Sequence, residues 1–261
     1  MRRKETDHLN RKVEFNFPPK RIISTVPSQT ELLSDLGLDD EVVGITRFCT
    51  SPKGWKKSKT IIGGTKRLDY NKISSLNPDL IIGNKEENIK PQVEEIATDF
   101  PYWISDVESF DDNQKLIKDI GELCNRNVEA EVLCTRIETV CSKIRSVQKT
   151  PKRVAYFIWR NPFMVAGNNT YINSILNKLG FVNVFEHLEG RYPKITLDDL
   201  KRVKVDEVFL SSIPFPFNEL HAQEFKMFFP DLKVTFVDGE VFSYYGSRIA
   251  KSEEYLLSLI K

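Results

Sequence analysis

Charged and aromatic side chains gather in the segments that follow the expected β-strands of this chain. Flat aromatic surfaces with a few placed charges suit a large, partly apolar ligand that carries polar groups at its edge. We therefore predict a binding site for such a ligand. The residues predicted to contact it are Ser28, Arg47, Phe48, Lys66, Arg67, Lys85, Trp159, Arg160, Tyr192, Phe215, Glu240, Phe242, Tyr244 and Tyr245.

Some of these side chains also have a purely structural interpretation. Trp159 ends an expected strand and could belong to the core, and Phe215 could anchor a loop. Lys85 belongs to a charge run of the kind that is usually solvated, although it directly follows a strand. The prediction of a ligand site therefore depends on position at strand ends, not on residue type alone.

The segment 21–33 predicts a turn from a strand into a helix. A run of β-branched residues is broken at Pro27, after which Ser28 can cap a helix and Glu31 can close a capping box. Free backbone N–H groups would then face the carboxyl end of the sheet, where open α/β sheets bind ligands. Ser28 stands where a nucleophile could stand, but no histidine base is evident nearby, so we interpret it as a cap.

Catalytic and metal-binding motifs are lacking in the sequence. It contains no G-x-S-x-G elbow and neither of the glycine-rich phosphate loops. The three histidines, His8, His187 and His221, lack the spacing of a metal site and are expected to be solvated or to cap helices. We predict a binding protein that is not an enzyme and has no metal ligands or intrinsic cofactor.

Composition favours a globular protein without a global charge. The 261 residues are 40% hydrophobic, and 38 Lys+Arg face 37 Asp+Glu, so no net field favours nucleic acid. The four cysteines are expected to be buried thiols, since Cys134 and Cys141 lie about 10 Å apart on one helix. The first residues lack the apolar core of a signal peptide, so we expect a cytoplasmic protein unless a leader has been removed.

Hydrophobic periodicity predicts two α/β lobes separated by one long helix. Expected strands are 21–26, 41–46, 79–83 and 101–104, then 153–159, 206–212 and 233–237; expected helices are 30–37, 70–77, 91–98 and 111–123, then 170–179, 197–203, 219–228 and 248–260. Between them an uninterrupted apolar stripe from Leu133 to Val147 predicts a helix over about 127–148. The predicted domains are an N-terminal Rossmann-like lobe over 1–125, a connecting helix over 126–150 and a C-terminal lobe over 151–261.

An internal repeat supports the interpretation of two lobes. Residues 69–82 can be aligned without gaps on residues 196–209. Each copy contains a short capped helix, an acidic residue and then an apolar strand. Equivalent positions in the two lobes are therefore expected, and Asn71 corresponds to Asp198.

Short motifs in a fixed order run through nearly the whole chain. They are Pro19–Ser24, Pro27–Glu31, Leu36–Gly37, Val42–Ile45, Ile62–Gly64, Leu76–Ile82, Gly167–Ile172 and Leu179–Phe185. In this order and spacing the chain resembles the helical-backbone (class III) substrate-binding proteins of ABC importers. That group carries cobalamin, ferric siderophores, haem or, in one branch, zinc and manganese. Pro27–Glu31, Asn161–Phe163 and Arg191–Ile195 are similar to the cobalamin-binding members.

The resemblance implies a periplasmic or membrane-anchored protein that holds a ligand between two lobes and delivers it to a permease. In this family one acidic residue per lobe docks on permease arginines, and the matching positions are Asn71 and Asp198. Tyr192 matches an aromatic that contacts the corrin ring. We expect a monomer that binds a corrinoid first and a ferric siderophore second. The alternatives are haem held by Tyr244 or Tyr245, a cytoplasmic corrinoid or tetrapyrrole carrier without a transport role, and an interaction module that has lost its ligand.

Overall fold

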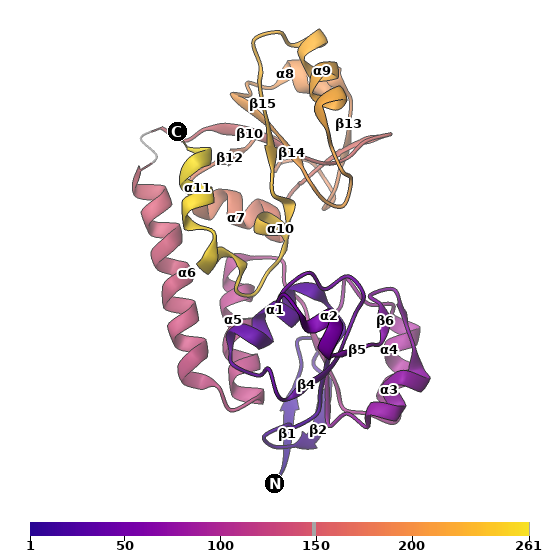
Figure 1. Cartoon of the computed structure of the whole chain (residues 1–261). Coiled ribbons are helices and arrows are strands. Elements are labelled where there is room, and N and C mark those ends of the chain that lie inside the picture. The colour runs from indigo at the N-terminus through magenta and orange to yellow at the C-terminus, as the bar shows by residue number, and fades with distance from the viewer. Residues whose placement is uncertain (148–149, 261) are drawn as a thin grey trace. The chain divides into compact units, whose positions relative to one another are not determined.

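The computed structural model describes residues 1–147 and 150–260, which form two compact units (Figure 1). Unit 1 comprises 1–107, 111–137 and 245–250, and unit 2 comprises 108–110, 138–244 and 251–261 apart from the undescribed residues. Both are α/β structures, as the sequence predicts. A short segment near the C-terminus, Tyr245–Ala250, thus belongs to the N-terminal unit.

Unit 1 is built on a five-stranded parallel sheet of order β5-β4-β3-β8-β9. The strands are β3 (Ile22–Ser24), β4 (Val42–Ile45), β5 (Thr60–Ile61), β8 (Leu80–Asn84) and β9 (Tyr102–Ser105). Strands covered on both faces consist of continuous apolar runs, and this pattern allowed four of the five to be predicted. The edge strand β5 was missed because two residues give no periodicity.

Helices cover both faces of this sheet (Figure 1). Helices α3 (Tyr70–Leu76) and α4 (Lys90–Ala97) lie on one face, and α1 (Pro27–Asp35) and α5 (Phe110–Leu123) lie on the other. Ile73 of α3 and Ile96 of α4 pack into a buried cluster with Ile23 and Ile81 of the central strands. This packing fixes the ends of the strands that lead into the candidate site.

Two small elements border the sheet, the helix α2 (Trp55–Ser58) and a hairpin of β6 (Gly63–Gly64) and β7 (Arg67–Leu68). Gly63 has a φ of 110°, and a Cβ there would lie 2.4 Å from the carbonyl oxygen of Arg67. Only glycine therefore allows this tight hairpin. The hairpin places Arg67 beside the beginning of α3.

An N-terminal hairpin of β1 (Arg2–Thr6) and β2 (Lys12–Asn16) was not predicted. It is anchored at its turn by Asp7, a buried carboxylate that accepts backbone hydrogen bonds from Leu9 (2.9 Å) and Arg11 (2.8 Å). His8 lies 2.7 Å from Asp119 of α5 through its Nε2 atom. Its strands were not predicted because β1 is charged and the buried apolar residues of the hairpin, Val13 and Phe15, both belong to β2.

The predicted long helix is present as α6 (Asn127–Val147), 21 residues without a break. Its buried stripe contains Ile137, Val140 and Ile144, but Val147 is exposed and ends outside the stripe. The predicted end at Gln148 lies outside the described residues. Residues up to Ile137 belong to unit 1 and those from Glu138 belong to unit 2, so one helix contributes to both.

Unit 2 contains a mixed six-stranded sheet of order β13-β11-β10-β14-β15, with β12 also paired to β10. The three predicted strands, β10 (Arg153–Trp159), β14 (Glu207–Ser211) and β15 (Lys233–Val237), are parallel. Three short strands were missed: β11 (Phe163–Val165), β12 (Val182–Asn183) and β13 (Lys194–Ile195). Both β11 pairings are antiparallel, so a small antiparallel extension borders the parallel core.

Helices also cover both faces of the sheet in unit 2 (Figure 1). They are α7 (Tyr171–Leu179), α8 (Leu197–Arg202), α9 (Glu219–Phe228), α10 (Gly239–Ser243) and α11 (Glu253–Leu259), with a 3₁₀ turn η1 (Arg248–Lys251). Leu200 of α8 and Phe225 of α9 pack into a core cluster with Phe157 and Leu210. The single helix predicted over 248–260 is wrong, since η1 ends at Lys251 and α11 begins at Glu253.

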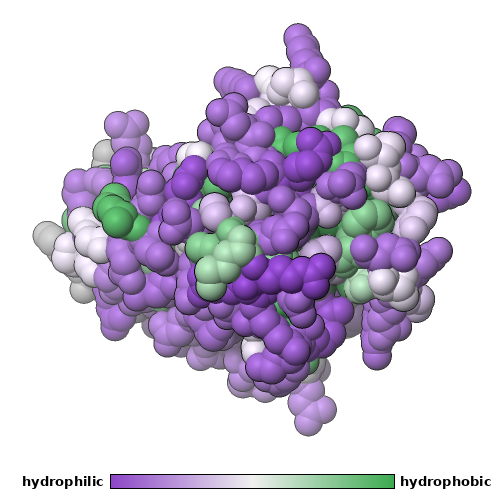
Figure 2. Space-filling view, turned by 90° about the horizontal axis from the view of Figure 1, so that it is seen from below, coloured by the Kyte–Doolittle hydropathy of each residue, from purple (hydrophilic) through white to green (hydrophobic). Residues whose placement is uncertain are grey.

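No helix in the described ranges has the length and apolar character needed to span a bilayer. Hydrophilic residues predominate on the face shown in Figure 2, where hydrophobic residues form separate small patches. The four cysteines are buried and free, which confirms their prediction as structural thiols.

Candidate functional site

The turn from β3 into α1 was predicted correctly, but its predicted cap is wrong. Helix α1 begins at Pro27 with Val26 as its N-cap, and no side chain caps it. Ser28 is buried inside the first turn, and Glu31 forms a buried ion pair with Arg248 at 2.9 Å instead of closing a capping box. Proline at the first helical position explains the shift, because it needs no hydrogen-bond partner there.

Beneath the strand ends of unit 1 lies a buried polar network. The Thr25 hydroxyl lies 2.9 Å from Oδ1 of Asn88 and 3.0 Å from the Tyr102 hydroxyl. Gln29 Nε2 donates to Oγ of Ser105 at 2.6 Å. A buried hydrogen-bonded network of this kind is costly to disturb, and within the described residues Oε1 of Gln29 is left without a partner. We name Thr25, Gln29, Asn88, Tyr102 and Ser105 the polar floor; their only sequence signal is a polar residue beside a strand end.

Tyr245 reaches this region from the C-terminal segment of unit 1 and is nearly fully buried. Burial, together with the Glu87 carboxylate, raises the pKa of its hydroxyl well above the ordinary value. Burial also raises the pKa of Glu87. A phenol that resists ionisation is a poor source of the tyrosinate that ferric haem would need, so this environment disfavours Tyr245 as a haem ligand.

The exposed loops of unit 1 bring together two pairs of predicted residues. Phe48 is 54% exposed and its ring centroid lies 6.0 Å from the Arg47 guanidinium. The Lys66 ammonium donates to the backbone carbonyl of Glu86, in the loop that also carries Lys85. Lys85 itself pairs with Asp106 at 2.6 Å. Lys85 is therefore held by an anchored ion pair and is not a free surface charge.

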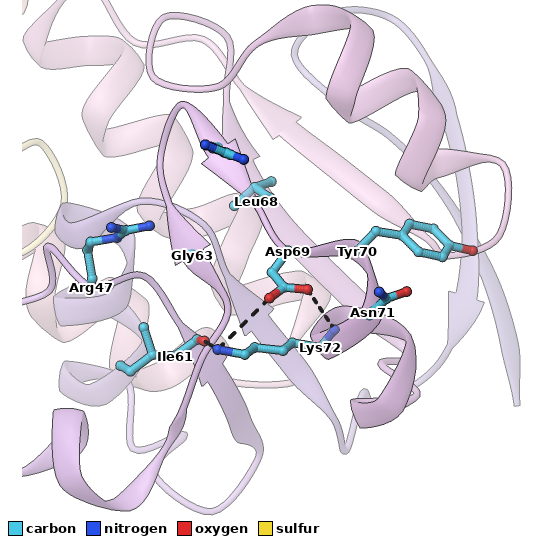
Figure 3. A pocket seen from close by; sticks show the side chains of 9 residues that line it. Arg47, Ile61, Gly63, Leu68, Asp69, Tyr70, Asn71 and Lys72 are labelled. Carbon is cyan, nitrogen blue, oxygen red and sulfur yellow. Dashed lines mark hydrogen bonds and ion pairs between the residues drawn. The ribbon is translucent and has the colours of Figure 1, made fainter.

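A pocket of about 620 Å³ opens beside the β6–β7 hairpin (Figure 3). Its lining residues are Arg47, Ile61, Gly63, Arg67, Leu68, Asp69, Tyr70, Asn71 and Lys72. It unites residues predicted for two roles, since Arg47 and Arg67 were predicted to bind ligand and Asn71 to dock a permease. We name it the hairpin pocket. No pattern in the sequence predicts this pocket.

In unit 2 an aromatic cluster forms where two central strands end. Trp159, the last residue of β10, is 40% exposed, and its ring lies 5.6 Å from that of Phe215 in an edge-to-face arrangement. Phe215 also contacts Phe217 at 4.8 Å and His221 at 5.1 Å, measured between ring centroids. Arg160 is fixed by an ion pair with Glu224 at 2.8 Å. The structure thus brings together Trp159 and Phe215, which lie 56 positions apart in the sequence.

Tyr192 lies in the segment that leads into β13 and is half-buried. Its neighbour Arg191 pairs with Glu108 at 3.0 Å, and the Arg191 carbonyl accepts a hydrogen bond from Gly167 at 2.9 Å. These contacts anchor the backbone around Tyr192.

The predicted residues around α10 have different environments. Asp238 caps the helix by accepting from the backbone N–H of Glu240 at 3.0 Å, and both Glu240 and Tyr244 are half-buried. Phe242 is fully buried, with ring centroids 5.3 Å from Tyr156 and 6.2 Å from Phe209. Phe242 is therefore a core residue, because no part of its ring can reach a ligand.

No group of three His, Cys, Asp or Glu side chains in the described part of the chain is placed to hold a metal ion. His221 accepts from the backbone N–H of Asn218 at 3.0 Å and closes a capping box, which confirms its predicted role. His187 is exposed. His8 is engaged in the N-terminal hairpin, so its predicted solvated or capping role is replaced by an anchoring one.

Each unit has parallel strands with polar or aromatic side chains beside their ends, the place where open α/β sheets bind ligands. Residues 22–229 match the periplasmic binding protein family, and the chain belongs to that family. It is 30% identical over 185 residues to an uncharacterized ABC transporter substrate-binding lipoprotein, YvrC, of Bacillus subtilis, covering 66% of this chain and 57% of that protein. The chain therefore spans little more than half the length of this relative.

Two further comparisons support the same class. A vitamin B12-binding protein of Vibrio vulnificus is 23% identical over 199 residues, covering 74% of this chain and 72% of that protein. The crystal structure of the periplasmic heme-binding protein HutB of Vibrio cholerae has a TM-score of 0.80 at 16% identity, covering 92% of this chain and 98% of that one. The fold is thus that of the class III substrate-binding proteins, as the resemblance implied. The matched family and these relatives are all described as binding proteins.

Proposed function

We propose that this chain binds a large metal chelate and presents it for ABC-type import. A corrinoid is the first choice of ligand and a ferric siderophore the second. Support comes from the family, from the B12-binding and heme-binding relatives, and from the aromatic surfaces at the strand ends. The chain's own role is to bind and release the chelate without covalent change.

The observation that carries this proposal is the exposed Trp159. A large aromatic side chain at the carboxyl end of a central strand would normally be covered, yet 40% of Trp159 is exposed. Its partner Phe215 packs against the ring in an edge-to-face arrangement, and the exposed part of the indole could contact a flat ligand. In unit 1, Phe48 provides a second exposed aromatic surface, steadied by Arg47. Such surfaces suit a macrocycle better than a small hydrophilic solute.

A second candidate is a corrinoid or tetrapyrrole carrier without a transport role. The observation that favours it is Asn71, an amide at the position where the family docks through a carboxylate. Haem comes third, because Tyr244 is half-buried whereas Tyr245 is enclosed. The proposed partners are the chelate and, for the importer, an ABC permease bound by a monomer.

Calorimetric titration of the full chain with cyanocobalamin, dicyanocobinamide, a ferric catecholate siderophore and haemin tests the proposal. We expect one of them to bind, and Trp159→Ala to weaken that binding by about 1–3 kcal/mol, the usual cost of losing a central aromatic contact. Phe236→Ala is the matched control, since Phe236 is 38% exposed on β15 of the same unit. No binding of any chelate, or equal losses in both variants, would contradict the proposal.

A further inference from the structure

The segment from Arg47 to Lys72 carries an unusual concentration of positive charge. It contains eight cationic residues, Arg47, Lys53, Lys56, Lys57, Lys59, Lys66, Arg67 and Lys72, and the single carboxylate Asp69. The local formal charge of +7 contrasts with +1 for the whole chain. A field of this strength attracts anionic partners and repels cationic ones.

The hairpin pocket lies within this segment and concentrates its charge (Figure 3). Arg47, Arg67 and Lys72 line it, together with the apolar side chains of Ile61 and Leu68. Charges beside an apolar wall are screened less by water than those on an open surface, so they interact more strongly with a counter-charge. The pocket therefore favours an anionic group that can enter it.

The one carboxylate in the pocket is already used. Asp69 caps α3 by accepting from the backbone N–H of Lys72 at 3.2 Å, and it lies 3.9 Å from the Lys72 ammonium. The Lys72 ammonium also donates to the carbonyl of Ile61 at 3.2 Å. These contacts, drawn in Figure 3, leave Asp69 occupied by Lys72.

The two arginines of the pocket have no carboxylate partner among residues 1–147 and 150–260. Arg47 is steadied by the Phe48 ring, and Arg67 is exposed on β7. By contrast, the side chain of Arg160 is paired with a carboxylate. An unpaired guanidinium offers a planar fork of donors that matches a carboxylate.

We propose that the hairpin pocket docks an acidic segment of a protein partner, whose Asp or Glu carboxylates pair with Arg47 and Arg67. The proposal goes beyond the proposed function, since the resemblance implies permease arginines at the position of Asn71 and the acidic segment would belong to another protein. It assigns these two arginines to docking rather than to the chelate. Asn71, at the pocket edge, adds a neutral amide that can bind a backbone group without repelling the acid.

The shape of the pocket favours a polypeptide over a membrane. The pocket-lining cations surround a concavity, whereas attraction to a flat anionic bilayer needs charges on a protruding surface. The side chain of Asp or Glu, with two or three carbons, can enter the concavity, contact Leu68 and pair with an arginine. A free small anion would gain the same pairing but would leave the apolar wall uncovered.

The charges around Asn71 of unit 1 also differ from those around the equivalent Asp198 of unit 2. Asp198, equivalent to Asn71, is a solvated carboxylate on α8, and its side chain is 72% exposed beside Lys201. The pocket of unit 1 thus has arginines without a carboxylate partner, whereas Asp198 and Asp199 of unit 2 pair with Lys201 and Arg202. An acidic segment would therefore favour unit 1 over this part of unit 2.

Fluorescence anisotropy with a labelled glutamate-rich peptide tests the proposal on the full chain. We expect binding at low salt that weakens with added salt and is absent for the same peptide with glutamine in place of glutamate. Arg47→Gln combined with Arg67→Gln should weaken it about tenfold or more, because two charge-assisted pairs are lost. Arg67→Lys should recover part of the affinity, since a point charge replaces the fork.

The matched control is Lys56→Gln combined with Lys57→Gln, two exposed cations of α2 that do not line the pocket. They should change the affinity by about twofold at most, as rim charges do. Equal losses in both double variants would show non-specific attraction and overturn the proposal. So would equal binding of the glutamine peptide, or tighter binding to phosphatidylglycerol vesicles or to free citrate than to the glutamate peptide.

Chelate titration of the unmodified protein separates this inference from the proposed function. If a chelate binds and the glutamate peptide does not, the docking inference fails and the proposed function stands. If the peptide binds and no chelate does, the pocket is confirmed and the proposed function fails. Circular dichroism of each variant shows whether it is folded.

Discussion

The helix–strand unit α3–β8 of unit 1 and its counterpart α8–β14 of unit 2 share a backbone design but differ on their surfaces. The sequence alignment of residues 69–82 with 196–209 extends to the strand bounds, since Leu80–Asn84 corresponds residue for residue to Glu207–Ser211. Asp69 and Thr196 occupy equivalent positions, and both cap their helices at 3.2 Å. The expected equivalence of the two copies is thus confirmed within each unit.

A clasp that the sequence did not reveal is also repeated. Asp79 accepts from the backbone N–H of Arg21 at 2.8 Å, and Asp206 accepts from that of Arg153 at 2.8 Å. Each arginine returns a hydrogen bond from its Nε to a carbonyl at the end of the repeat helix, Leu76 or Lys204, at 2.7 Å. The carboxylate and arginine thus tie a helix end to the start of a neighbouring strand.

The contrast shows which positions the architecture constrains. Caps and clasps satisfy backbone groups that every such turn exposes, so both copies keep them. Among the described residues, Asn71 and Asp198 cap no helix and clasp no strand, since Asp198 pairs only with Lys201 of its own helix, and the two differ in charge. The differences between the units are therefore where separate functions for each lobe can arise.

The largest expected effect concerns Gly83, whose counterpart in unit 2 is Leu210. A Cβ at Gly83 would lie 2.6 Å from Oδ1 of Asn88 and 2.8 Å from Oγ1 of Thr25. Gly83→Ala should lower the free energy of unfolding by about 3 kcal/mol, through crowding and disruption of the polar floor. Leu210→Ala should cost about 2–5 kcal/mol by leaving a cavity.

Urea unfolding followed by circular dichroism measures both variants. If Gly83→Ala were neutral, the polar floor would not be tightly packed around this strand. The space available for a side chain would then no longer explain why unit 1 has Gly83 where unit 2 has Leu210.

The clasps should show the next largest effect. Asp79→Ala should cost about 2 kcal/mol of unfolding free energy, and Asp206→Ala about 1 kcal/mol, in urea titrations. Asp79 accepts from the backbone N–H groups of both Lys20 and Arg21, each at 2.8 Å, whereas Asp206 accepts from one. Asp79→Asn is the control, because it keeps one acceptor. Equal costs for Asp79→Ala and Asp206→Ala would contradict this account.

Removal of either cap should have a smaller effect. Asp69→Ala and Thr196→Ala should each cost about 1 kcal/mol, the usual value for an N-cap. Thr196 should be the more sensitive, because Asp199 completes a capping box in α8 whereas unit 1 has Lys72 at that position. Ser is a matched replacement at Thr196 and should restore most of the loss. A larger loss at Asp69 would reverse the expected order.

The capping box should make α8 sensitive to acid. Hydrogen bonds from the backbone and hydroxyl of Thr196 lower the pKa of Asp199 below its ordinary 3.8. The folded pKa is thus below the unfolded one, so the contribution is fully present above the ordinary value and is lost as pH falls through the folded pKa. Carboxyl NMR titration should show a higher pKa for Asp199 in Thr196→Ala than in the unmodified chain. An unchanged value would exclude this cause.

The smallest effect on stability is expected where the charge differs. Asn71→Asp and Asp198→Asn should change the unfolding free energy by less than about 0.5 kcal/mol, because both side chains are exposed. Their effect should instead be on association. Asn71→Asp should weaken binding of the glutamate-rich peptide at low salt, and added salt should reduce the difference. Stronger binding by Asn71→Asp would indicate that this face meets a cationic partner.

The fold could be predicted where local sequence and burial agree. Ile22–Ser24, Leu80–Asn84 and Arg153–Trp159 are continuous apolar runs between turn residues, so their strands were found. The β1–β2 hairpin was missed because a charged strand has no apolar run. Its turn is anchored by buried Asp7, which accepts a hydrogen bond from Ile104, far away in the sequence. The end of the chain was predicted as one helix because nothing local marks the break at Ser252.

The candidate site was predicted less completely, because spatial neighbours are set by topology. Position at strand ends selected Trp159 and Phe215 separately, and the structure places their rings side by side. The same criterion wrongly included Phe242. Its exposure depends on the side chains that pack over it, Tyr156 and Phe209, and these cannot be predicted from its position. The criterion also missed the hairpin pocket, because a two-residue hairpin brings Arg67 beside α3 without any periodic pattern.

The polar floor of unit 1 has a consequence for the thermodynamics of binding. Thr25, Gln29 and Ser105 are held by hydrogen bonds before any ligand arrives, and their side chains are fully buried. A ligand that rests above them would order few protein groups, so little conformational entropy would be lost on binding. Slow amide hydrogen exchange at the ends of β3 and β9, equal in the free and bound protein, would be the signature of a surface shaped in advance.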